Sequence, residues 1–162
     1  MEDLVGQTLV TQGGGDMPLA EASAGIKYFG FYFGAHWAPC CRRFTETLKE
    51  DYDLINANGN KQFEVIFVSK DGNQNAFDRN FAEMPWKAVK YDDEARKKSL
   101  EQKYGIMEIP MLIIVKASDG SQTSDNGIKD LMSHRADVIE HWDKCGQAGA
   151  DGAAAGDGAA AQ

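Results

Sequence analysis

The chain is poor in cysteine and in basic residues, and each shortage excludes a class of protein. Its 162 residues include only three cysteines, two of them adjacent, which is a poor basis for the disulfide framework of a small secreted domain. The chain has 17 lysines and arginines and 25 aspartates and glutamates, and the resulting net charge of −8 argues against nucleic acid as a partner. No apolar run is long enough to cross a membrane, and the first residues do not resemble a signal peptide. We therefore expect a cytoplasmic protein without a membrane or nucleic-acid partner.

What is present suits one folded domain. The chain is 43% hydrophobic and 26% charged, which is typical of a globular protein with its own core. Residues 146–162 consist only of alanine, glycine, aspartate and glutamine, and such a segment cannot bury enough surface to offset its ordering entropy. The composition predicts a folded domain over residues 1–145 and a disordered acidic tail over residues 146–162. We also expect a monomer.

Strand and helix patterns alternate along the domain. Apolar, aromatic and alternating patterns predict strands at Leu4–Val10, Met17–Ala20, Ile26–Phe33, Phe63–Ser69, Met111–Val115 and Ser121–Thr123. Apolar residues at helical spacing predict helices from Pro39 to a stop at Asn58-Gly59-Asn60, over Asn73–Phe81, over Asp93–Tyr104, and over Ile128–Trp142 with a candidate break near Ser133-His134. Alternating strands and helices followed by a hairpin predict an α/β fold, with a central mixed sheet flanked by helices on both faces.

The most informative stretch is Trp37-Ala38-Pro39-Cys40-Cys41-Arg42, directly after the strand expected at Ile26–Phe33. A strand that leads into a tryptophan, a proline and a cysteine at the start of a helix is the layout of a dithiol redox site. Such a site needs two thiols three residues apart, so that both lie on one face of the helix end. Here Cys41 occupies the second position, Ala38 stands at the first, and Cys40 is an additional neighbour.

Four blocks in this order resemble the tryparedoxins, the trypanothione-dependent thioredoxin relatives of trypanosomatid parasites, and more distantly the nucleoredoxins. The blocks are Tyr32–Thr45 around the motif, the strand and turn Phe63–Asp71, the tripeptide Met84-Pro85-Trp86, and the approach Tyr104–Pro110. The resemblance covers about Met17 to Asp130 and implies a thioredoxin-like fold, with a cis-proline at Ile109-Pro110 facing the dithiol. It also implies that Trp86 is structural and that Cys41 is the buried resolving thiol.

The chain departs from the family pattern at three positions. The attacking cysteine of the family corresponds to Ala38, the second proline between its cysteines corresponds to Cys40, and a tryptophan corresponds to Lys70. The first departure puts the dithiol reaction in doubt, because alanine offers no nucleophile. The other two change the surface that meets a substrate.

Two hypotheses for function follow from these departures. In the first, the protein is a binding or adaptor module that holds a partner without turnover, in a groove formed by Trp37, Pro39, Lys70, Glu108, Ile109 and Pro110. In the second, it is an atypical thiol-disulfide oxidoreductase of trypanothione-linked redox homeostasis, in which Cys40 or Cys41 is catalytic. Either way the expected partner is a protein or a thiol such as trypanothione or glutathione, and no cofactor or metal is expected.

The remaining cysteines and histidines carry weaker signals. A disulfide between Cys40 and Cys41 is not expected, because adjacent Cα atoms lie about 3.8 Å apart and disulfides usually need about 4.4–6.8 Å. Cys40 alone, in a first helical turn beside arginines, favours a thiolate and monothiol exchange; the simpler interpretation is a small side chain tolerated in place of proline. His36 is expected to face solvent rather than bind a metal. We expect His134 and His141 to be isolated helix residues and Cys145 to be an exposed bystander.

Overall fold

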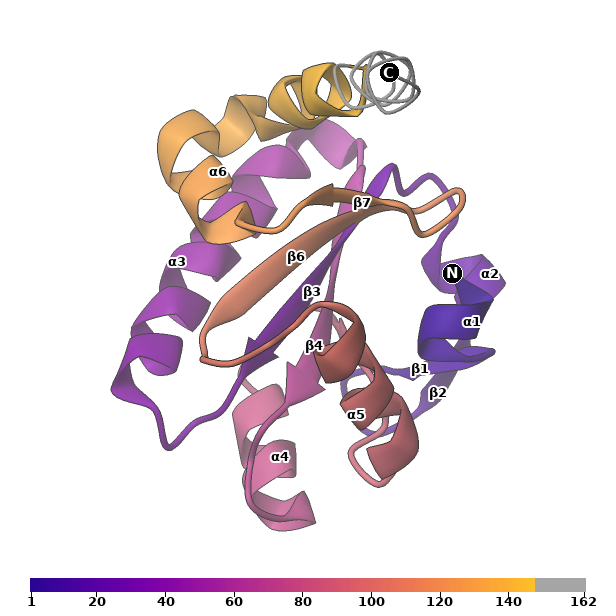
Figure 1. Cartoon of the computed structure of the whole chain (residues 1–162), viewed down its shortest axis with the longest axis vertical. Coiled ribbons are helices and arrows are strands. Elements are labelled where there is room, and N and C mark those ends of the chain that lie inside the picture. Colours follow the sequence, from indigo (N-terminus) through magenta and orange to yellow (C-terminus); the bar gives the residue numbers. More distant parts are fainter. Residues whose placement is uncertain (148–162) are drawn as a thin grey trace, which may run out of the picture.

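A seven-stranded mixed sheet forms the centre of the protein in the computed structural model, which describes residues 1–147 (Figure 1). The strands are β1 (Thr8–Val10), β2 (Asp16–Pro18), β3 (Tyr28–Gly34), β4 (Phe63–Ser69), β5 (Lys87–Ala88), β6 (Met111–Lys116) and β7 (Gln122–Ser124). Their order across the sheet is β2-β1-β5-β4-β3-β6-β7. Strands β3, β4 and β5 run parallel, while the other neighbouring pairs are antiparallel. The predicted α/β thioredoxin-like fold with a mixed sheet is confirmed.

Helices cover both faces of this sheet. They are α1 (Glu2–Val5), α2 (Leu19–Ala22), α3 (Pro39–Ile55), α4 (Gln74–Phe81), α5 (Glu94–Lys103) and α6 (Gly127–His134), with short 3₁₀ turns at Ala57–Gly59 and Arg135–Asp137. Helices α3 and α6 lie on one side of the sheet, and α1, α2 and α5 lie on the other (Figure 1). The chain is again helical over residues 138–147.

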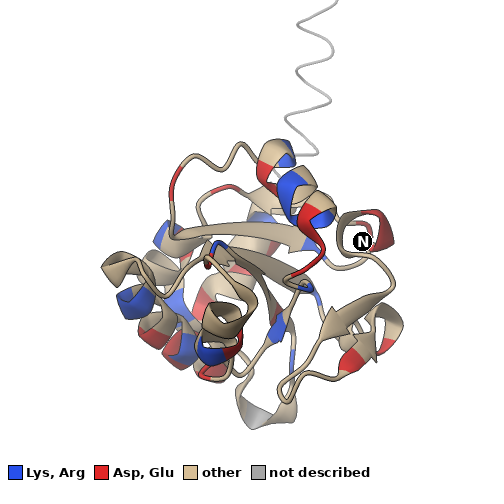
Figure 2. Cartoon of the chain, turned by 90° about the horizontal axis from the view of Figure 1, so that it is seen from below, with Lys and Arg blue, Asp and Glu red and all other residues tan. Residues whose placement is uncertain are grey.

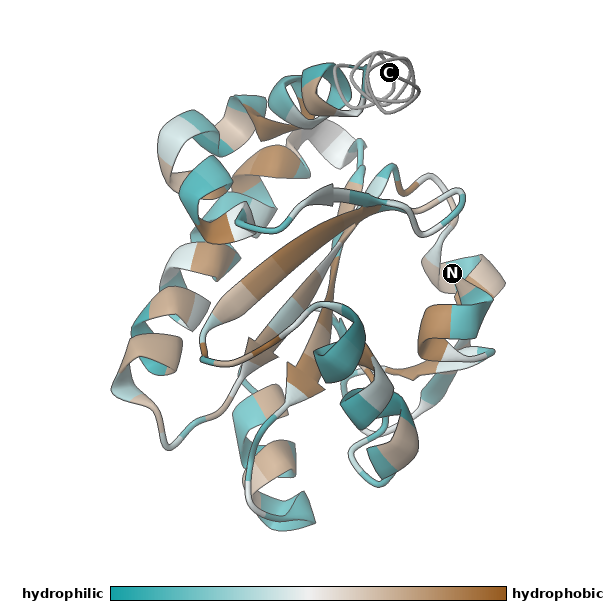
Figure 3. Cartoon of the chain, in the orientation of Figure 1, coloured by the Kyte–Doolittle hydropathy of each residue, from teal (hydrophilic) through white to brown (hydrophobic). Residues whose placement is uncertain are grey.

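Alternation along β3 explains why two cores form. Tyr28 and Tyr32 point into the core beneath α3, α4 and α6, whereas Phe29, Phe31 and Phe33 point into the core beneath α1, α2 and α5. The strands are accordingly the most hydrophobic part of the ribbon in Figure 3. Charged residues gather on the helices and loops in Figure 2, which leaves the sheet largely uncharged. The central strands are buried on both faces, so they present no pattern of alternating polar residues.

The structure corrects the N-terminal predictions. The expected strand Leu4–Val10 is divided into helix α1, which ends at Val5, and strand β1, which begins at Thr8. The expected strand Met17–Ala20 is likewise divided, because Pro18 ends β2 and is the N-cap of α2. Strand β5 was not predicted, since its two residues form too short a run to show a period.

The C-terminal helix breaks at the predicted place. Helix α6 ends at His134, and Arg135 adopts a positive φ of 48° before the helix resumes. Residues 146 and 147 still belong to this last helical segment, and the rest of the expected tail lies outside the described residues. Within residues 1–147, no helix is both long enough and apolar enough to span a membrane.

Candidate functional site

The motif lies in the loop that joins β3 to α3. Ala38 is the N-cap residue of α3 and Pro39 is its first helical residue, where the missing N–H of proline costs nothing. Ala38 is 8% exposed, so its methyl group lies at the surface of the core rather than in solvent. The site is therefore at the positive end of the α3 dipole, where a negative charge is stabilised.

Cys41 lies in the first turn of α3 and is only 1% exposed. Burial raises the pKa of the Cys41 thiol, because the interior disfavours the thiolate. The turn is anchored by the Tyr32 hydroxyl, which lies 3.0 Å from the Cys41 carbonyl oxygen and 2.8 Å from Thr45 Oγ1. Gly34 makes room for this tyrosine, since a Cβ at Gly34 would lie 2.7 Å from the Tyr32 ring. The expected burial of Cys41 is confirmed.

Cys40 is exposed, and it is not joined to Cys41 in a disulfide. The neighbouring Arg42 donates through Nη1 to the main-chain oxygen of His36 at 2.6 Å, so this guanidinium braces the loop. His36 itself is exposed, as predicted. The chain therefore offers solvent one accessible thiol at this helix end, with its neighbour buried.

Asp71 connects the motif loop to the turn after β4. Its Oδ1 accepts a hydrogen bond from the His36 N–H at 2.9 Å. Its Oδ2 accepts from Ser69 Oγ at 2.6 Å and from Asn80 Nδ2 at 3.2 Å. The indole N–H of Trp37 donates to the main-chain oxygen of Lys70 at 3.1 Å, which is a second link between the two loops. The motif loop and the turn after β4 are thus joined both by the buried Asp71 carboxylate and by the Trp37 indole.

A hollow of about 330 Å³ opens beside Ala38. It is lined by Trp37, Ala38, Lys70, Ile106, Met107, Glu108 and Ile109. Trp37 is 64% exposed and Met107 is 94% exposed, so two large apolar side chains that border the hollow have most of their surface open to solvent. The Ile109-Pro110 peptide bond is cis, as predicted.

Four of the six predicted groove residues line this hollow, namely Trp37, Lys70, Glu108 and Ile109, while Pro39 and Pro110 do not. Sequence reasoning missed Ile106 and Met107. The available signal was an apolar pair just after Gly105, in a loop where apolar side chains have no helix or strand to bury them.

Comparison with known proteins agrees with this arrangement. A family model described as "Thioredoxin-like" matches residues 25–122. The chain belongs to the thioredoxin-like family. It is similar to nucleoredoxin of Danio rerio, with 42% identity over 106 residues that make up 65% of this chain and 25% of that protein. The chain thus spans about a quarter of the length of this curated relative.

Two solved structures place the thioredoxin-like domain near the tryparedoxins. Native tryparedoxin I from Crithidia fasciculata superposes with a TM-score of 0.72 at 32% identity, over 80% of this chain and 87% of that one. Tryparedoxin II complexed with glutathionylspermidine superposes with a TM-score of 0.72 at 27% identity, over 78% of this chain and 85% of that one. The predicted resemblance to the tryparedoxins and nucleoredoxins is confirmed, but the nucleoredoxins are not the more distant of the two, because the identity is 42% to nucleoredoxin and 32% to tryparedoxin I.

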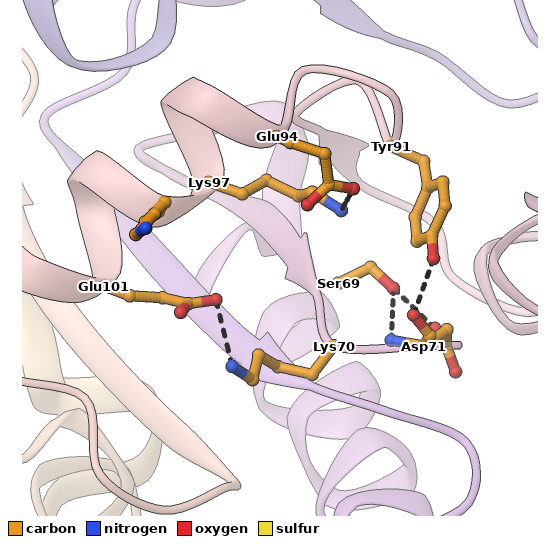
Figure 4. Close-up of a pocket in the computed structure, with 8 residues that line it drawn as sticks. Ser69, Lys70, Asp71, Tyr91, Glu94, Lys97 and Glu101 are labelled. Carbon is orange, nitrogen blue, oxygen red and sulfur yellow. Dashed lines mark hydrogen bonds and ion pairs between the residues drawn. The ribbon is translucent and has the colours of Figure 1, made fainter. Parts of the chain in front are cut away.

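A second, polar pocket of about 330 Å³ adjoins the hollow in this thioredoxin-like domain (Figure 4). Lys70 lines both, and its ammonium pairs with Glu101 at 3.2 Å. The buried Lys97 lies 3.8 Å from the centroid of the Tyr91 ring and pairs with Glu94 at 3.0 Å. These charges come from the turn after β4 and from α5, so no single segment of the sequence indicates that Lys70 meets Glu101.

The structure overturns the prediction that His134 and His141 are isolated. Their rings stack with centroids 4.0 Å apart across the helix break at Arg135. His141 also lies 3.4 Å from Asp130 and 3.5 Å from the sulfur of Cys145, which is half-buried rather than an exposed bystander. The break folds the last helical segment back toward α6, and sequence spacing could not show that contact.

Proposed function

We propose that this thioredoxin-like protein is a binding module that holds a protein or thiol partner in the hollow beside Ala38, without dithiol exchange. The proposal depends on the identity of the residue at the N-cap of α3. The resemblance to the tryparedoxins assigns this position to the attacking cysteine, and here it is Ala38. A thiolate at this position would benefit from the helix dipole, but a methyl group cannot attack a disulfide.

The other thiols do not replace the missing one. Cys41 is buried and its pKa is raised, and both effects make it a poor nucleophile. Cys40 is exposed, but its only cysteine neighbour is the buried Cys41. Side chains of adjacent helix residues also diverge, so Cys41 is poorly placed to resolve a mixed disulfide formed at Cys40.

The hollow retains what partner binding needs. Trp37 and Met107 supply exposed apolar surface, and Glu108 and Lys70 supply charges of opposite sign at its border. Large exposed aromatic and methionine side chains are favoured at interaction surfaces. A tryparedoxin neighbour is complexed with glutathionylspermidine, which supports a thiol-bearing molecule as one class of partner.

A second candidate function rests on the exposure of Cys40. This thiol lies in the first turn of α3 and is open to solvent. Cys40 would then form a mixed disulfide with a small thiol or a protein, and an external thiol would have to release it. In this alternative the chain is a monothiol oxidoreductase or a substrate of thiolation.

The test is a trypanothione-coupled disulfide-reductase assay with insulin as the substrate. We expect the wild-type protein to be inactive and the Ala38→Cys variant to gain activity, because Cys41 already lies at the required spacing. Ala38→Ser is the matched control, since it adds a hydroxyl of similar size and no thiol. Activity in the wild type that disappears in Cys40→Ser would contradict the binding module and favour monothiol exchange.

A further inference from the structure

A second group of reactive side chains lies on the C-terminal helical segment, away from the motif. The sulfur of Cys145 lies 3.5 Å from His141 Nε2, one helical turn earlier. The same nitrogen lies 3.4 Å from Asp130 Oδ1, on α6. The other oxygen of Asp130 accepts a hydrogen bond from the buried indole N–H of Trp142 at 3.0 Å. The Nε2 edge of the imidazole thus faces both a fixed carboxylate and a thiol.

This thiol is at the opposite end of the sheet from Cys40 and Cys41. The helical segment that carries it meets the start of β3, where Lys27 and Tyr28 bond to Asp143 at 2.6 and 2.7 Å. The motif follows the end of the same strand, six residues later, which is about 20 Å away at 3.3 Å per residue. In Figure 1 the helical segment of residues 138–147 lies at the top of the view, and α3 begins far from it, at the lower left. Cys145 therefore cannot form a disulfide with either motif cysteine of its own chain.

A hollow of about 560 Å³ adjoins the last turn of this helical segment. Its lining includes two lysines, Lys27 and Lys116, the Tyr28 side chain, and Gly146 directly after Cys145. The Lys116 ammonium lies against Gly146, since a Cβ there would be 3.4 Å from Nζ. Lys27 already pairs with Asp143, whereas Lys116 forms no ion pair within residues 1–147. The lining of the hollow thus carries two lysines and one carboxylate, Asp143, and it includes the residue that follows the thiol in the chain.

We infer that Cys145 is a second thiol site, which forms a mixed disulfide with a small disulfide that carries carboxylates. The Cys145 thiol transfers its proton to His141, and the thiolate attacks one sulfur of the reagent. A new S–S bond forms at Cys145, the S–S bond of the reagent breaks, and the departing thiolate takes the proton from His141. One protein thiol and one small disulfide therefore become one mixed disulfide and one small thiol, with no other oxidant.

Each neighbour has a distinct part in this reaction. Asp130 lies beside the same ring nitrogen as the thiol, and its negative charge stabilises the imidazolium that forms on proton transfer. Trp142 keeps that carboxylate in place, because its indole is fully buried. Lys116 attracts a carboxylate of the incoming disulfide. This site is independent of the proposed function, since none of these residues lines the hollow beside Ala38.

The experiment measures the rate at which oxidised glutathione modifies Cys145 in the full chain, with peptide mass spectrometry to separate Cys145 from Cys40. We expect His141→Gln to slow modification of Cys145 about tenfold at neutral pH, because the thiol loses its base. The control is His36→Gln, which removes an exposed histidine beside the motif and should leave the Cys145 rate unchanged. Circular dichroism and urea unfolding establish that both variants are folded.

A neutral reagent tests the role of the lysine. Lys116→Gln should slow the reaction of Cys145 with oxidised glutathione about threefold and leave its reaction with hydroxyethyl disulfide unchanged, because only the first carries carboxylates. Adducts confined to Cys40, or equal Cys145 rates in His141→Gln and His36→Gln, overturn the proposal. Equal slowing of both reagents by Lys116→Gln overturns the preference for an anionic disulfide.

Discussion

Asp71 is the residue whose removal should loosen the candidate binding site most. Its carboxylate is buried and accepts hydrogen bonds from the His36 N–H, from Ser69 Oγ and from Asn80 Nδ2. These bonds join the loop before α3 to the turn after β4 and to α4. The Asp71→Ala variant would leave all three donors without their acceptor.

The size of the effect follows from these three bonds. A hydrogen bond to a charged group contributes about 1.5–3 kcal/mol, and a buried donor left unpaired costs about 1–3 kcal/mol. Water that enters the space left by the carboxylate can bond to the unpaired donors and so offsets part of the lost stabilisation. We therefore expect Asp71→Ala to lower the free energy of unfolding by about 3–4 kcal/mol. In Asp71→Asn the amide oxygen still accepts from His36, while the amide nitrogen faces Asn80, so a loss of about 1–2 kcal/mol is expected.

Urea unfolding monitored by circular dichroism measures these differences. Asp78→Ala is the matched control, because the Asp78 carboxylate is exposed and, within residues 1–147, accepts only from Gln74 Nε2. It should change the free energy of unfolding by less than about 0.5 kcal/mol. A loss below about 1 kcal/mol in Asp71→Ala would refute the reasoning, since the three donors would then be satisfied without the carboxylate.

Two further predictions concern the thiols and the acid dependence of stability. In the native protein iodoacetamide should modify Cys40 rapidly and Cys41 only after unfolding, because Cys41 is buried and its pKa is raised; equal rates by peptide mass spectrometry would contradict this. Burial alone would raise the pKa of Asp143, but hydrogen bonds from Lys27 and Tyr28 outweigh it and hold that pKa below the ordinary value of an aspartate. The stabilisation lost in Asp143→Asn should therefore be constant from pH 5 to 7 and should disappear as the pH falls below the native pKa; a difference from wild type that grows on acidification would contradict this.

Much of the fold could be predicted because the decisive patterns are local. The apolar run Phe63–Ser69 is long enough for a strand buried on both faces, and Pro39 after an extended segment marks the start of α3. The break near His134 was also predictable in position. The short elements at the N-terminus were not, because α1 and β1 are held by tertiary contacts: Val5 and Leu9 are buried in the core that contains Leu100 of α5.

The candidate site was predictable only where the motif is contiguous. Trp37, Ala38, Cys40 and Cys41 follow one another in the chain, and the helix start decides which thiol faces solvent. Met107 was missed, because the same loop sequence could equally have been buried. The polar pocket around Lys97 was missed for a different reason: its residues come together only because α5 packs on one particular face of the sheet.

The sequence alone determined the family, the α/β alternation and the alanine at the N-cap of α3, because each of these is set by consecutive residues and their local backbone preferences. Tertiary structure alone decided that Asp71 joins two loops 35 residues apart in the chain and that Cys145 meets His141 and Asp130 beside a positively charged hollow. Such contacts depend on how the helices pack on the sheet and where the last helix bends. Packing and bending are set by the whole core, so no single segment of the sequence contains them.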